Sequence, residues 1–237
     1  MVPITHWVPS DRDHYLCGGY YQEPHYEYPE THHSDTNLPI RLSADQSLLF
    51  KNEPSNLIGH VMLQQGNRTL YADHVSFERQ ASSGRLKQIQ AEGHFLLNEP
   101  GLQIEGQSAS AQFLDGLLTI QKAIYLLPRE HTRGTADRIE LSIERSASLK
   151  NARYTTCTPK NPDWELVADH IVLNQKTGRG RARHAKLLVK DKPVLYFPYI
   201  DFPIDDRRKS GFLYPIVGQS NLSGTQLELP YYWNIAP

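Results

Sequence analysis

From Leu38 onward, hydrophobic and polar residues alternate in short segments, and turn residues separate these segments at intervals of about ten residues. The segments are rich in β-branched and apolar residues, and stretches with the period of a helix are hard to find. Short alternating segments with regular turns are typical of a sandwich or solenoid of strands. The pattern therefore predicts an all-β fold of stacked antiparallel hairpins.

The clearest predicted turn is Asp115-Gly116, which separates the strand-like segments 110–114 and 117–120. A two-residue type I′ turn needs positive φ at both central positions, and Asp-Gly meets this need. We therefore predict a tight hairpin here. Four more turns are expected, at Gly66-Asn67, Ser82-Ser83-Gly84, Asn98-Glu99-Pro100-Gly101 and Thr177-Gly178.

A weak repeat accompanies the turns. Ala-Asp pairs begin at Ala44, Ala72, Ala136 and Ala168, and Ala109-Ser110 fills the gap, which gives steps of 28, 37, 27 and 32 residues. Such spacings favour stacked supersecondary units. We expect the recurring small residue to mark an inward position where neighbouring rungs approach closely.

The first 37 residues are rich in Tyr, His, Pro and Glu and show neither the helical nor the strand period, so we expect an extended arm. Their start lacks the basic and apolar regions of a secretory signal, which suggests a start introduced at Met1 after removal of one. No run approaches the roughly 18 apolar residues of a membrane-spanning helix, because the most apolar stretch, Val194–Ile200, is short and contains Pro198.

The charge of the chain limits the classes of binding partner to be expected. A net charge of -1 gives no overall attraction to nucleic acid or anionic membranes, so any anion binding must be local. The run Asp205–Lys209 is typical of a solvated turn held by local ion pairs, and its arginines are also a first candidate for phosphate contacts. Arg179, Arg181, Arg183 and Lys186 alternate along a strand-like stretch and form a weaker candidate site for anions.

No pattern indicates catalysis. The 11 histidines lack the paired cysteine or carboxylate spacing of zinc sites. There is no Gly-x-Ser-x-Gly elbow, phosphate-binding loop or Cys-His pair at catalytic spacing. We therefore predict no enzymatic activity, metal or cofactor. The two cysteines, Cys17 and Cys157, are compatible with one bridge, two free thiols, or two halves of bridges to a segment outside this sequence.

Near the carboxyl end, Pro215 and Pro230 bracket two short strand-like segments. Proline cannot donate a ladder hydrogen bond, so a seam between these strands is expected to be weak. Tyr231-Tyr232-Trp233 then resembles the aromatic belt at a membrane boundary, although such a triplet taken alone is more often a packed aromatic surface.

These last residues carry a resemblance. The segment 202–215, FPIDDRRKSGFLYP, and the segment 229–237, LPYYWNIAP, resemble the LptD (OstA/Imp) family of outer-membrane lipopolysaccharide (LPS) assembly proteins. The likeness extends upstream through Tyr196–Tyr199, Thr156–Pro159 with Trp164, and the repeat region to Cys17. It covers nearly the whole chain.

The resemblance implies an extended arm over 1–37, a periplasmic OstA-type β-jelly roll over 38–209, and the first strands of an outer-membrane β-barrel over 210–237. Such a jelly roll receives LPS from an LptA-type periplasmic bridge protein and passes it to the barrel, which an LptE-type lipoprotein plugs. Bridge domains join by strand addition to a sheet edge, and the edge at Leu38–Phe50 is the candidate docking surface. The implied location is the outer membrane, with this domain in the periplasm.

Residue roles follow from the resemblance. Pro215 and Pro230 match strand-breaking prolines that open a lateral gate for lipid. Cys17 and Cys157 match two amino-terminal cysteines whose native partners lie beyond this sequence, so here they are expected to pair with each other. Our own hypothesis from the alternation is an inward apolar groove for acyl chains, lined by Val61, Leu63, Ala72, Phe95, Leu97, Ile104, Ala109, Phe113, Leu118 and Ile120.

Two alternatives remain open at this level. The first is a structural or adhesive β-solenoid with a closed core whose surface binds protein partners. The second is a cupin-like metalloenzyme on a jelly roll. Periodicity alone cannot distinguish a filled core from an open groove.

Overall fold

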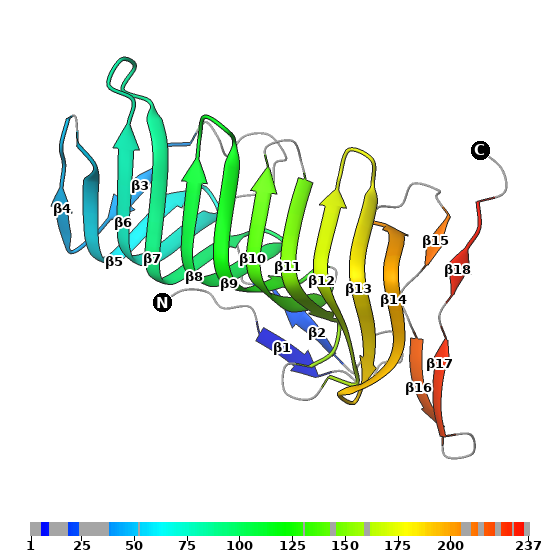
Figure 1. The fold of residues 1–237 in the computed structure, drawn as a ribbon. Coiled ribbons are helices and arrows are strands. Elements are labelled where there is room, and N and C mark those ends of the chain that lie inside the picture. The colour runs from blue at the N-terminus through cyan, green and yellow to red at the C-terminus, as the bar shows by residue number, and fades with distance from the viewer. Residues whose placement is uncertain are drawn as a thin grey trace.

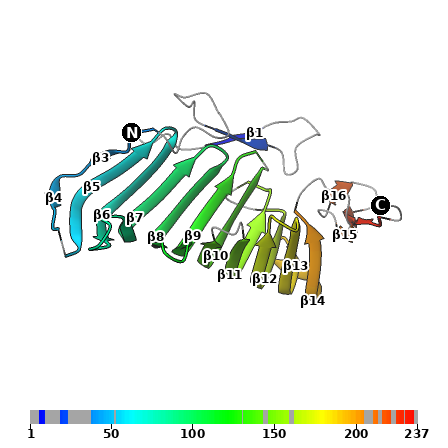
Figure 2. The same ribbon diagram turned by 90° about the horizontal axis from the view of Figure 1, so that it is seen from above.

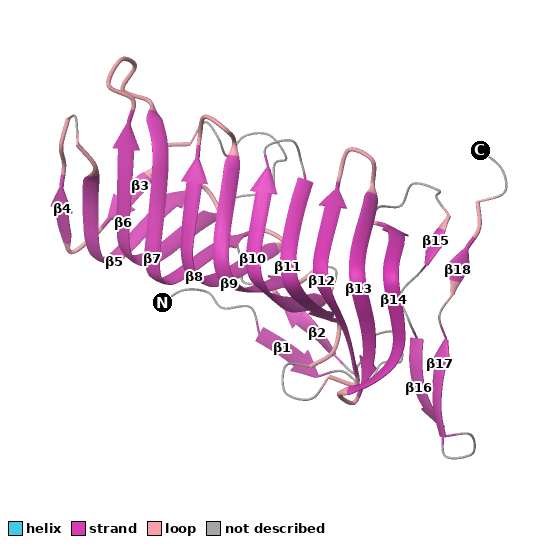
Figure 3. Ribbon diagram, viewed as in Figure 1, coloured by secondary structure: helices cyan, strands magenta, loops and turns pink. Residues whose placement is uncertain are grey.

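The computed structural model describes residues 6–9, 19–23, 38–51, 53–129, 131–142, 146–158, 162–204, 210–212, 216–220, 224–228 and 230–234. All regular elements in these ranges are strands (Figure 3). They are β1 (His6–Pro9), β2 (Gly19–Gln22), β3 (Arg41–Ser43), β4 (Gln46–Leu48), β5 (Ser55–Gln65), β6 (Arg68–Arg79), β7 (Leu86–Glu99), β8 (Leu102–Gln112), β9 (Leu117–Leu127), β10 (Thr132–Ser142), β11 (Ser146–Thr155), β12 (Trp164–Asn174), β13 (Arg179–Val189), β14 (Lys192–Pro203), β15 (Gly211–Phe212), β16 (Ile216–Ser220), β17 (Gly224–Glu228) and β18 (Tyr231–Tyr232).

One antiparallel sheet contains twelve of these strands, in the order β14 to β5 followed by β3, with β4 also paired to β5 (Figure 1). Strands adjacent in sequence are thus neighbours in space. The predicted all-β class and the stack of antiparallel hairpins are confirmed. The four additional predicted turns are also confirmed, because each lies between the strands it was expected to connect.

The hairpin at Asp115-Gly116 is confirmed, but the predicted two-residue turn is wrong. Gln112 pairs with Leu117, so residues 113–116 form a four-residue loop. Of these four, Gly116 alone has positive φ (59°), whereas a type I′ turn needs two such residues. Because the register differs from the expected one by two residues, each strand side chain keeps its predicted face.

Part of the amino-terminal segment forms a hairpin, so the prediction of an extended arm is wrong there. β1 pairs with β2, and the rings of Trp7 and Tyr21 meet edge to face at 5.0 Å. The Glu23 carboxylate accepts a 2.7 Å hydrogen bond from the Gly101 amide and lies 3.6 Å from Arg129. These contacts hold the hairpin beside the turns at one end of the sheet (Figures 1 and 2).

The long strands all bend at one level, so the sheet folds back on itself (Figure 1). At the bend, two consecutive residues face outward. On β12, Ala168 and Ile171 are buried, whereas Asp169 is exposed and His170 half-buried between them. Inward residues are therefore three positions apart at the bend, and the alternation of a regular strand is interrupted.

A left-handed residue makes the bend on each odd-numbered strand from β5 to β13. Left-handed φ costs an L-residue about 1–2 kcal/mol, so it needs compensation. Each of these residues bonds through its side chain to an aspartate of a neighbouring chain segment. We call this set the bend ladder: His60 with Asp45 (2.7 Å), His94 with Asp73 (2.7 Å), Lys122 and Asn151 with Asp137 (both 2.7 Å), and His184 with Asp169 (2.9 Å).

Small side chains occupy the inner side of the bend. The predicted Ala-Asp pairs at Ala44, Ala72, Ala136 and Ala168 all lie there, each supplying an aspartate of the bend ladder. Ala109-Ser110 does not, so this member of the predicted repeat is wrong. β8 bends instead at Gly106, where an added Cβ would come within 2.9 Å of Ile120 Cγ2.

The two edges of the sheet differ. β14 pairs only with β13 in the described sheet and contains Pro193, Pro198 and Pro203. β3 and β4 at the other edge are three residues each and contain no proline. Beyond β14, the short pairs β16–β17 and β15–β18 follow separately from the large sheet. The expected division of the chain at residues 37 and 209 stays a prediction.

We expect a larger side chain at the inner bend to destabilise the fold. Ala152 is fully buried and pairs with Ala168 on the next strand. Ala152→Leu should lower the free energy of unfolding by about 1–3 kcal/mol, because overpacking forces neighbouring strands apart. Urea denaturation measures this.

Ala147→Leu is the matched control, since Ala147 lies half-buried on the same strand but near its open end. Its cost should be clearly smaller. Equal costs for the two variants would contradict a special packing limit at the bend.

Candidate functional site: the inner face and the Cys157 loop

Inward side chains of neighbouring strands line up in rows that cross the sheet on both sides of the bend. On one side the paired residues are Leu63, Leu70, Leu97, Ile104, Tyr125, Gly134, Tyr154, Leu166, Leu187 and Leu195. On the other side they are Leu57, Val75, Ala91, Ala109, Ile120, Ile139, Leu149, Ile171, Ala182 and Ile200. One apolar inner face thus runs from β5 to β14.

Glycine makes room for aromatic rings in these rows. A Cβ on Gly134 would lie 2.3 Å from the Tyr125 hydroxyl, so only glycine fits opposite this ring. The hydroxyl donates a 2.9 Å hydrogen bond to the Arg153 carbonyl, and burial raises the pKa of Tyr125. The polar end of the ring is therefore satisfied, and the ring adds apolar area to the inner face.

Nine of the ten predicted groove residues lie on this inner face. Val61, Ala72, Phe95, Ile104, Ala109 and Ile120 are buried, and Leu63, Leu97 and Leu118 are half-buried. Phe113 is the exception: it lies beyond the end of β8, in the loop, and is 50% exposed. It was misplaced because the predicted two-residue turn extended β8 by two residues.

The two halves of the inner face are packed against each other. Eight of the ten predicted lining residues, all except Leu63 and Phe113, belong to or pack against one buried cluster that includes residues from β5 to β13. A small cavity of about 30 Å³, lined by Leu38, Pro39, Arg41, Gln64 and Gly66, has room for roughly one or two water molecules and not for a lipid chain. The inner face is continuous, and its side chains range from fully buried, as at Val61, to half-buried, as at Leu97.

The amino-terminal edge leaves apolar side chains in solvent. The residues with large exposed fractions are Ile40 (62%), Leu42 (50%), Leu48 (50%), Leu49 (67%) and Phe50 (47%). Leu42 pairs with Leu63, so the row of inward residues continues to this edge. Large exposed apolar patches on soluble domains usually mark a binding surface.

The outer side of the bend is polar and charged. Hydrogen bonds with Asp45 and Asp73, and their negative charges, raise the pKa of His60 and His94. Hydrogen bonds from Lys122 and Asn151 lower the pKa of Asp137. Both effects favour the charged partners, so the bend ladder keeps ion pairs on the outer face and apolar groups on the inner one.

Cys157 lies in a separate small core at the end of β11. Its side chain is fully buried with Trp164 and Leu187, and it is disulfide-bonded. Cys17, the other cysteine of the chain, lies outside the described residues. Its predicted pairing with Cys157 therefore stays a prediction.

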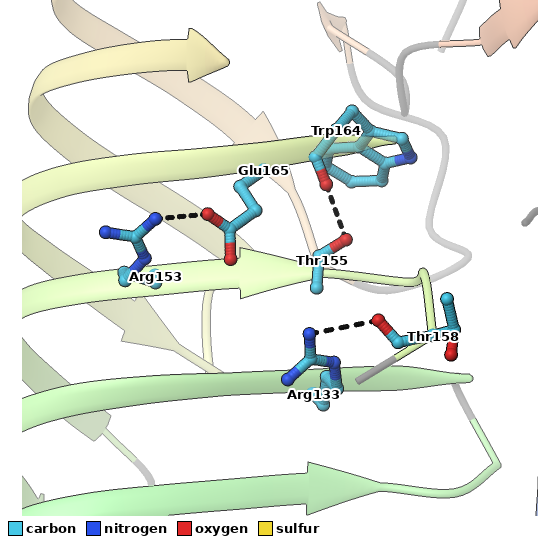
Figure 4. A network of polar contacts seen from close by, with 6 residues as sticks. All are labelled: Arg133, Arg153, Thr155, Thr158, Trp164 and Glu165. Atoms are coloured by element: carbon cyan, nitrogen blue, oxygen red, sulfur yellow. Dashed lines mark hydrogen bonds and ion pairs between the residues drawn. The ribbon is translucent and has the colours of Figure 1, made fainter. Parts of the chain in front are cut away.

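Two polar side chains fix the Cys157 loop (Figure 4). Arg133 donates hydrogen bonds of 3.1 Å to the carbonyls of Cys157 and Thr158. The Thr155 hydroxyl donates to the Trp164 carbonyl (2.6 Å) and accepts from the Cys157 amide (3.1 Å). Reasoning from the sequence missed both residues, because nothing in the spacing of Arg133 links it to a loop 24 residues away.

At the carboxyl end, β15 pairs with β18 and β16 with β17. Three residues separate β15 from β16, and two separate β17 from β18; of these five, only Pro230 is a described residue. Pro230 thus lies between β17 and β18, and Pro215 lies outside the described residues. The aromatic side chains of Tyr231 and Trp233 are 53% and 73% exposed.

The described residues lack two other kinds of feature, a metal site and a membrane-spanning helix. These residues contain no group of three or more His, Cys, Asp or Glu side chains placed to hold a metal ion. They also contain no helix long and apolar enough to cross a membrane. The inner face, its amino-terminal edge and the Cys157 loop are therefore the candidate functional features.

Comparison with known proteins bears on these features. Residues 42–116 match the family described as LptA/(LptD N-terminal domain) LPS transport protein. The LPS-assembly protein LptD of Hahella chejuensis is 38% identical over 225 residues, which are 93% of this chain and 28% of that protein. That of Saccharophagus degradans is 33% identical over 221 residues, 93% of this chain and 25% of that protein. The chain belongs to the LptD family.

This LptD-family chain spans about a quarter of the length of the curated relatives just described. The LptD of Pseudomonas entomophila is 36% identical over 222 residues. Among solved structures, the LptA-homologous periplasmic protein LptH of Pseudomonas aeruginosa is similar, with 19% identity and a TM-score of 0.39, covering 46% of this chain and 79% of that protein.

For this LptD-family chain we expect Arg133 to protect the disulfide of Cys157. The sulfur is buried, so a reductant reaches it only when the loop opens locally. Arg133→Gln removes a charged donor to two loop carbonyls and should speed reduction by dithiothreitol roughly fivefold or more. Maleimide-polyethylene glycol labelling over time, read as a gel shift, measures the rate.

Arg138→Gln is the control, because Arg138 lies on the same strand but pairs with Glu140. It should leave the reduction rate unchanged, and equal acceleration by both variants would refute the role of Arg133. The chain before reduction should show no reactive thiol. Two reactive sulfurs would refute the predicted pairing of Cys17 with Cys157.

Proposed function

We propose that this domain carries LPS toward the outer membrane, with the acyl chains against its inner face. The supporting observation is the apolar face that crosses the sheet from β5 to β14 and reaches solvent at the amino-terminal edge. The relatives named above are LPS-assembly proteins, which agrees with a transport role and with the absence of an enzymatic pattern in the sequence.

The energetics explain why such a face is needed. Exposing an acyl chain of about a dozen methylenes to water costs on the order of 10 kcal/mol, at about 0.8 kcal/mol per CH₂. A continuous apolar surface removes most of this cost at every step along the sheet. A deep specific pocket would oppose onward movement, because tight binding slows release.

The buried part of the interior must open for lipid to enter. Hydrogen bonds join neighbouring strands along the sheet, whereas inward residues of the two rows, such as Ile104 and Ile120, share one apolar cluster. A lipid chain that separates the halves replaces these contacts with equivalent apolar contacts, so the net cost of opening is small. Phe113 and Leu114, half or more exposed at the turn end of one half, offer a first apolar contact.

The amino-terminal edge is our proposed docking surface for an LptA-type jelly-roll bridge protein. β3 and β4 are three residues each, are separated by Ala44 and Asp45, and pair only with β5 among the described strands, so their other edge is open to a further strand. A strand added there would extend the sheet and its inner rows into the partner. The exposed side chains of Leu42 and Leu48 would be covered in the same step.

At the other end we propose that residues 210–237 begin an outer-membrane barrel, which an LptE-type lipoprotein plugs. Pro215 and Pro230 cannot donate a ladder hydrogen bond, which supports a weak seam near them that serves as a lateral gate. In this proposal the domain lies in the periplasm, and the native disulfide partners of Cys17 and Cys157 follow the barrel.

Photo-crosslinking tests the lipid path. A benzophenone amino acid at Leu97 or Leu118 should capture LPS, because both side chains are half-buried on the inner face and tolerate replacement better than fully buried ones. The same amino acid at Leu96 or Thr119, their outward neighbours, is the matched control. Immunoblotting for LPS on the purified chain measures the adduct.

The expected result is an LPS adduct at the inward positions and none above background at the outward ones. Adducts from Leu96 and Thr119 alone would show that the lipid uses the outer face. Circular dichroism on each variant establishes that the fold is intact. Absence of adducts at all four positions in folded protein incubated with LPS would reject lipid carriage by this sheet.

A further inference from the structure

The outer face of the last strands carries an excess of positive charge. Between the strand ends, the outward side chains of β11 to β14 include three carboxylates and six cations, an excess of 6 − 3 = 3. The carboxylates are Glu165, Asp169 and Asp201, and the cations are Lys150, Arg153, Arg179, Arg181, Arg183 and Lys186.

The carboxylates on this face are already engaged. Glu165 pairs with Arg153, and Asp169 pairs with His184. Asp201 is shared by Arg179 and Arg181. Lys150, Arg183 and Lys186 are exposed and pair with no carboxylate among the described residues. Their charge is therefore available to an external anion.

The available cations lie beside exposed tyrosines. Lys150, His170, Arg183 and Tyr199 are direct neighbours across β11, β12, β13 and β14. At a strand spacing of about 4.8 Å, this row is roughly 14 Å long. Lys186 pairs with Tyr196 in a parallel row on the far side of the bend. We call the set the basic tyrosine surface: the available cations Lys150, Arg183 and Lys186, the exposed Arg181 that pairs with Asp201, and Tyr196 and Tyr199.

This arrangement suits an extended anionic plane better than a single small anion. The six side chains are exposed on the convex side of a sheet and do not enclose a pocket, and Tyr196 and Tyr199 are 53% and 55% exposed. Tyrosine favours the boundary between water and lipid, where its ring is apolar and its hydroxyl is wet. Lysine and arginine beside it are attracted to anionic headgroups.

The place of the basic tyrosine surface in the fold also favours contact with an anionic plane. β14 is followed by the segment that contains β15 and β18, and Figure 1 shows these strands next to the β14 end of the sheet. There Tyr231, Tyr232 and Trp233 expose a second aromatic group. The outer face of β7 and β8, by contrast, carries Glu92 and Glu105. The outer face of β11–β14 thus carries an excess of cations where that of β7 and β8 carries these two acids.

We propose that the basic tyrosine surface binds the anionic phospholipid headgroups of a bilayer, so that the outer face of β11–β14 rests on a membrane. The contact goes beyond the proposed carriage of LPS: it uses the opposite face of the sheet and does not require that the inner face hold lipid. Each proposal can therefore fail separately.

Vesicle flotation tests this contact with the full 237-residue chain. We expect binding to vesicles of equal parts phosphatidylglycerol and phosphatidylcholine, and little binding to phosphatidylcholine alone. The triple variant Lys150→Gln, Arg183→Gln, Lys186→Gln should bind about a hundredfold more weakly, since each cation near an anionic membrane contributes roughly fivefold. Raised salt should also weaken the binding of the wild-type chain to the anionic vesicles, because salt screens the attraction between charges.

A charge-matched triple variant is the control: Arg41→Gln, Lys51→Gln and Arg85→Gln, at exposed cations toward the amino-terminal end of the sheet. It should bind like the wild-type chain. Tyr196→Ser with Tyr199→Ser, which keeps every charge, should also weaken binding and so separates a bilayer contact from attraction to phosphate alone.

Three results would overturn the proposal. One is equal loss of binding in both triple variants, which reports net charge alone. Another is no binding to anionic vesicles by the folded wild-type chain. The third is unchanged vesicle binding by the first triple variant together with loss of binding to LPS micelles, which would assign the surface to the LPS headgroup.

Discussion

The structure depends on a single constraint, namely that all strands of a hydrogen-bonded sheet must bend at the same level if the sheet is to fold back on itself. A left-handed residue on every second strand from β5 to β13 produces this bend. An aspartate from a neighbouring segment bonds to each of them, as Asp73 does to His94. The hydrogen bond offsets the cost of left-handed φ, and alanine on the inner side leaves room for the strands to turn.

The bend also gives the sheet its two chemical faces. On β13, Ala182, Ala185 and Leu187 are buried inside, whereas Arg183 and Lys186 are exposed outside. Along a strand, side chains alternate between the two faces, so one strand supplies both apolar inward and charged outward residues. Because two consecutive residues face outward at the bend, apolar residues point inward on both halves of the strand. An apolar inner face and a charged outer surface are therefore consequences of the same backbone geometry.

Much of this fold follows from local signals in the sequence. Strands and turns were predicted correctly because alternation and turn residues act over a few positions, and nine of ten predicted groove residues reached the inner face for the same reason. The step of three residues at the bend was not predicted, and so Ala109 was assigned to the bend in place of Gly106. Contacts between distant segments, such as Trp7 with Tyr21 or Arg133 with the Cys157 loop, have no local signal at all.

The two sheet edges give the domain a direction. Three prolines in β14 remove donors from the outer edge of the sheet, and an edge without donors is a poor template for another strand. β3 and β4 contain no proline, and the apolar row continues to them through Leu42 and Leu63. Strand addition is thus favoured at the amino-terminal edge and disfavoured at β14. A chain of such domains would grow from the amino-terminal edge alone, which leaves the β14 end, with its basic and aromatic side chains, to face the membrane.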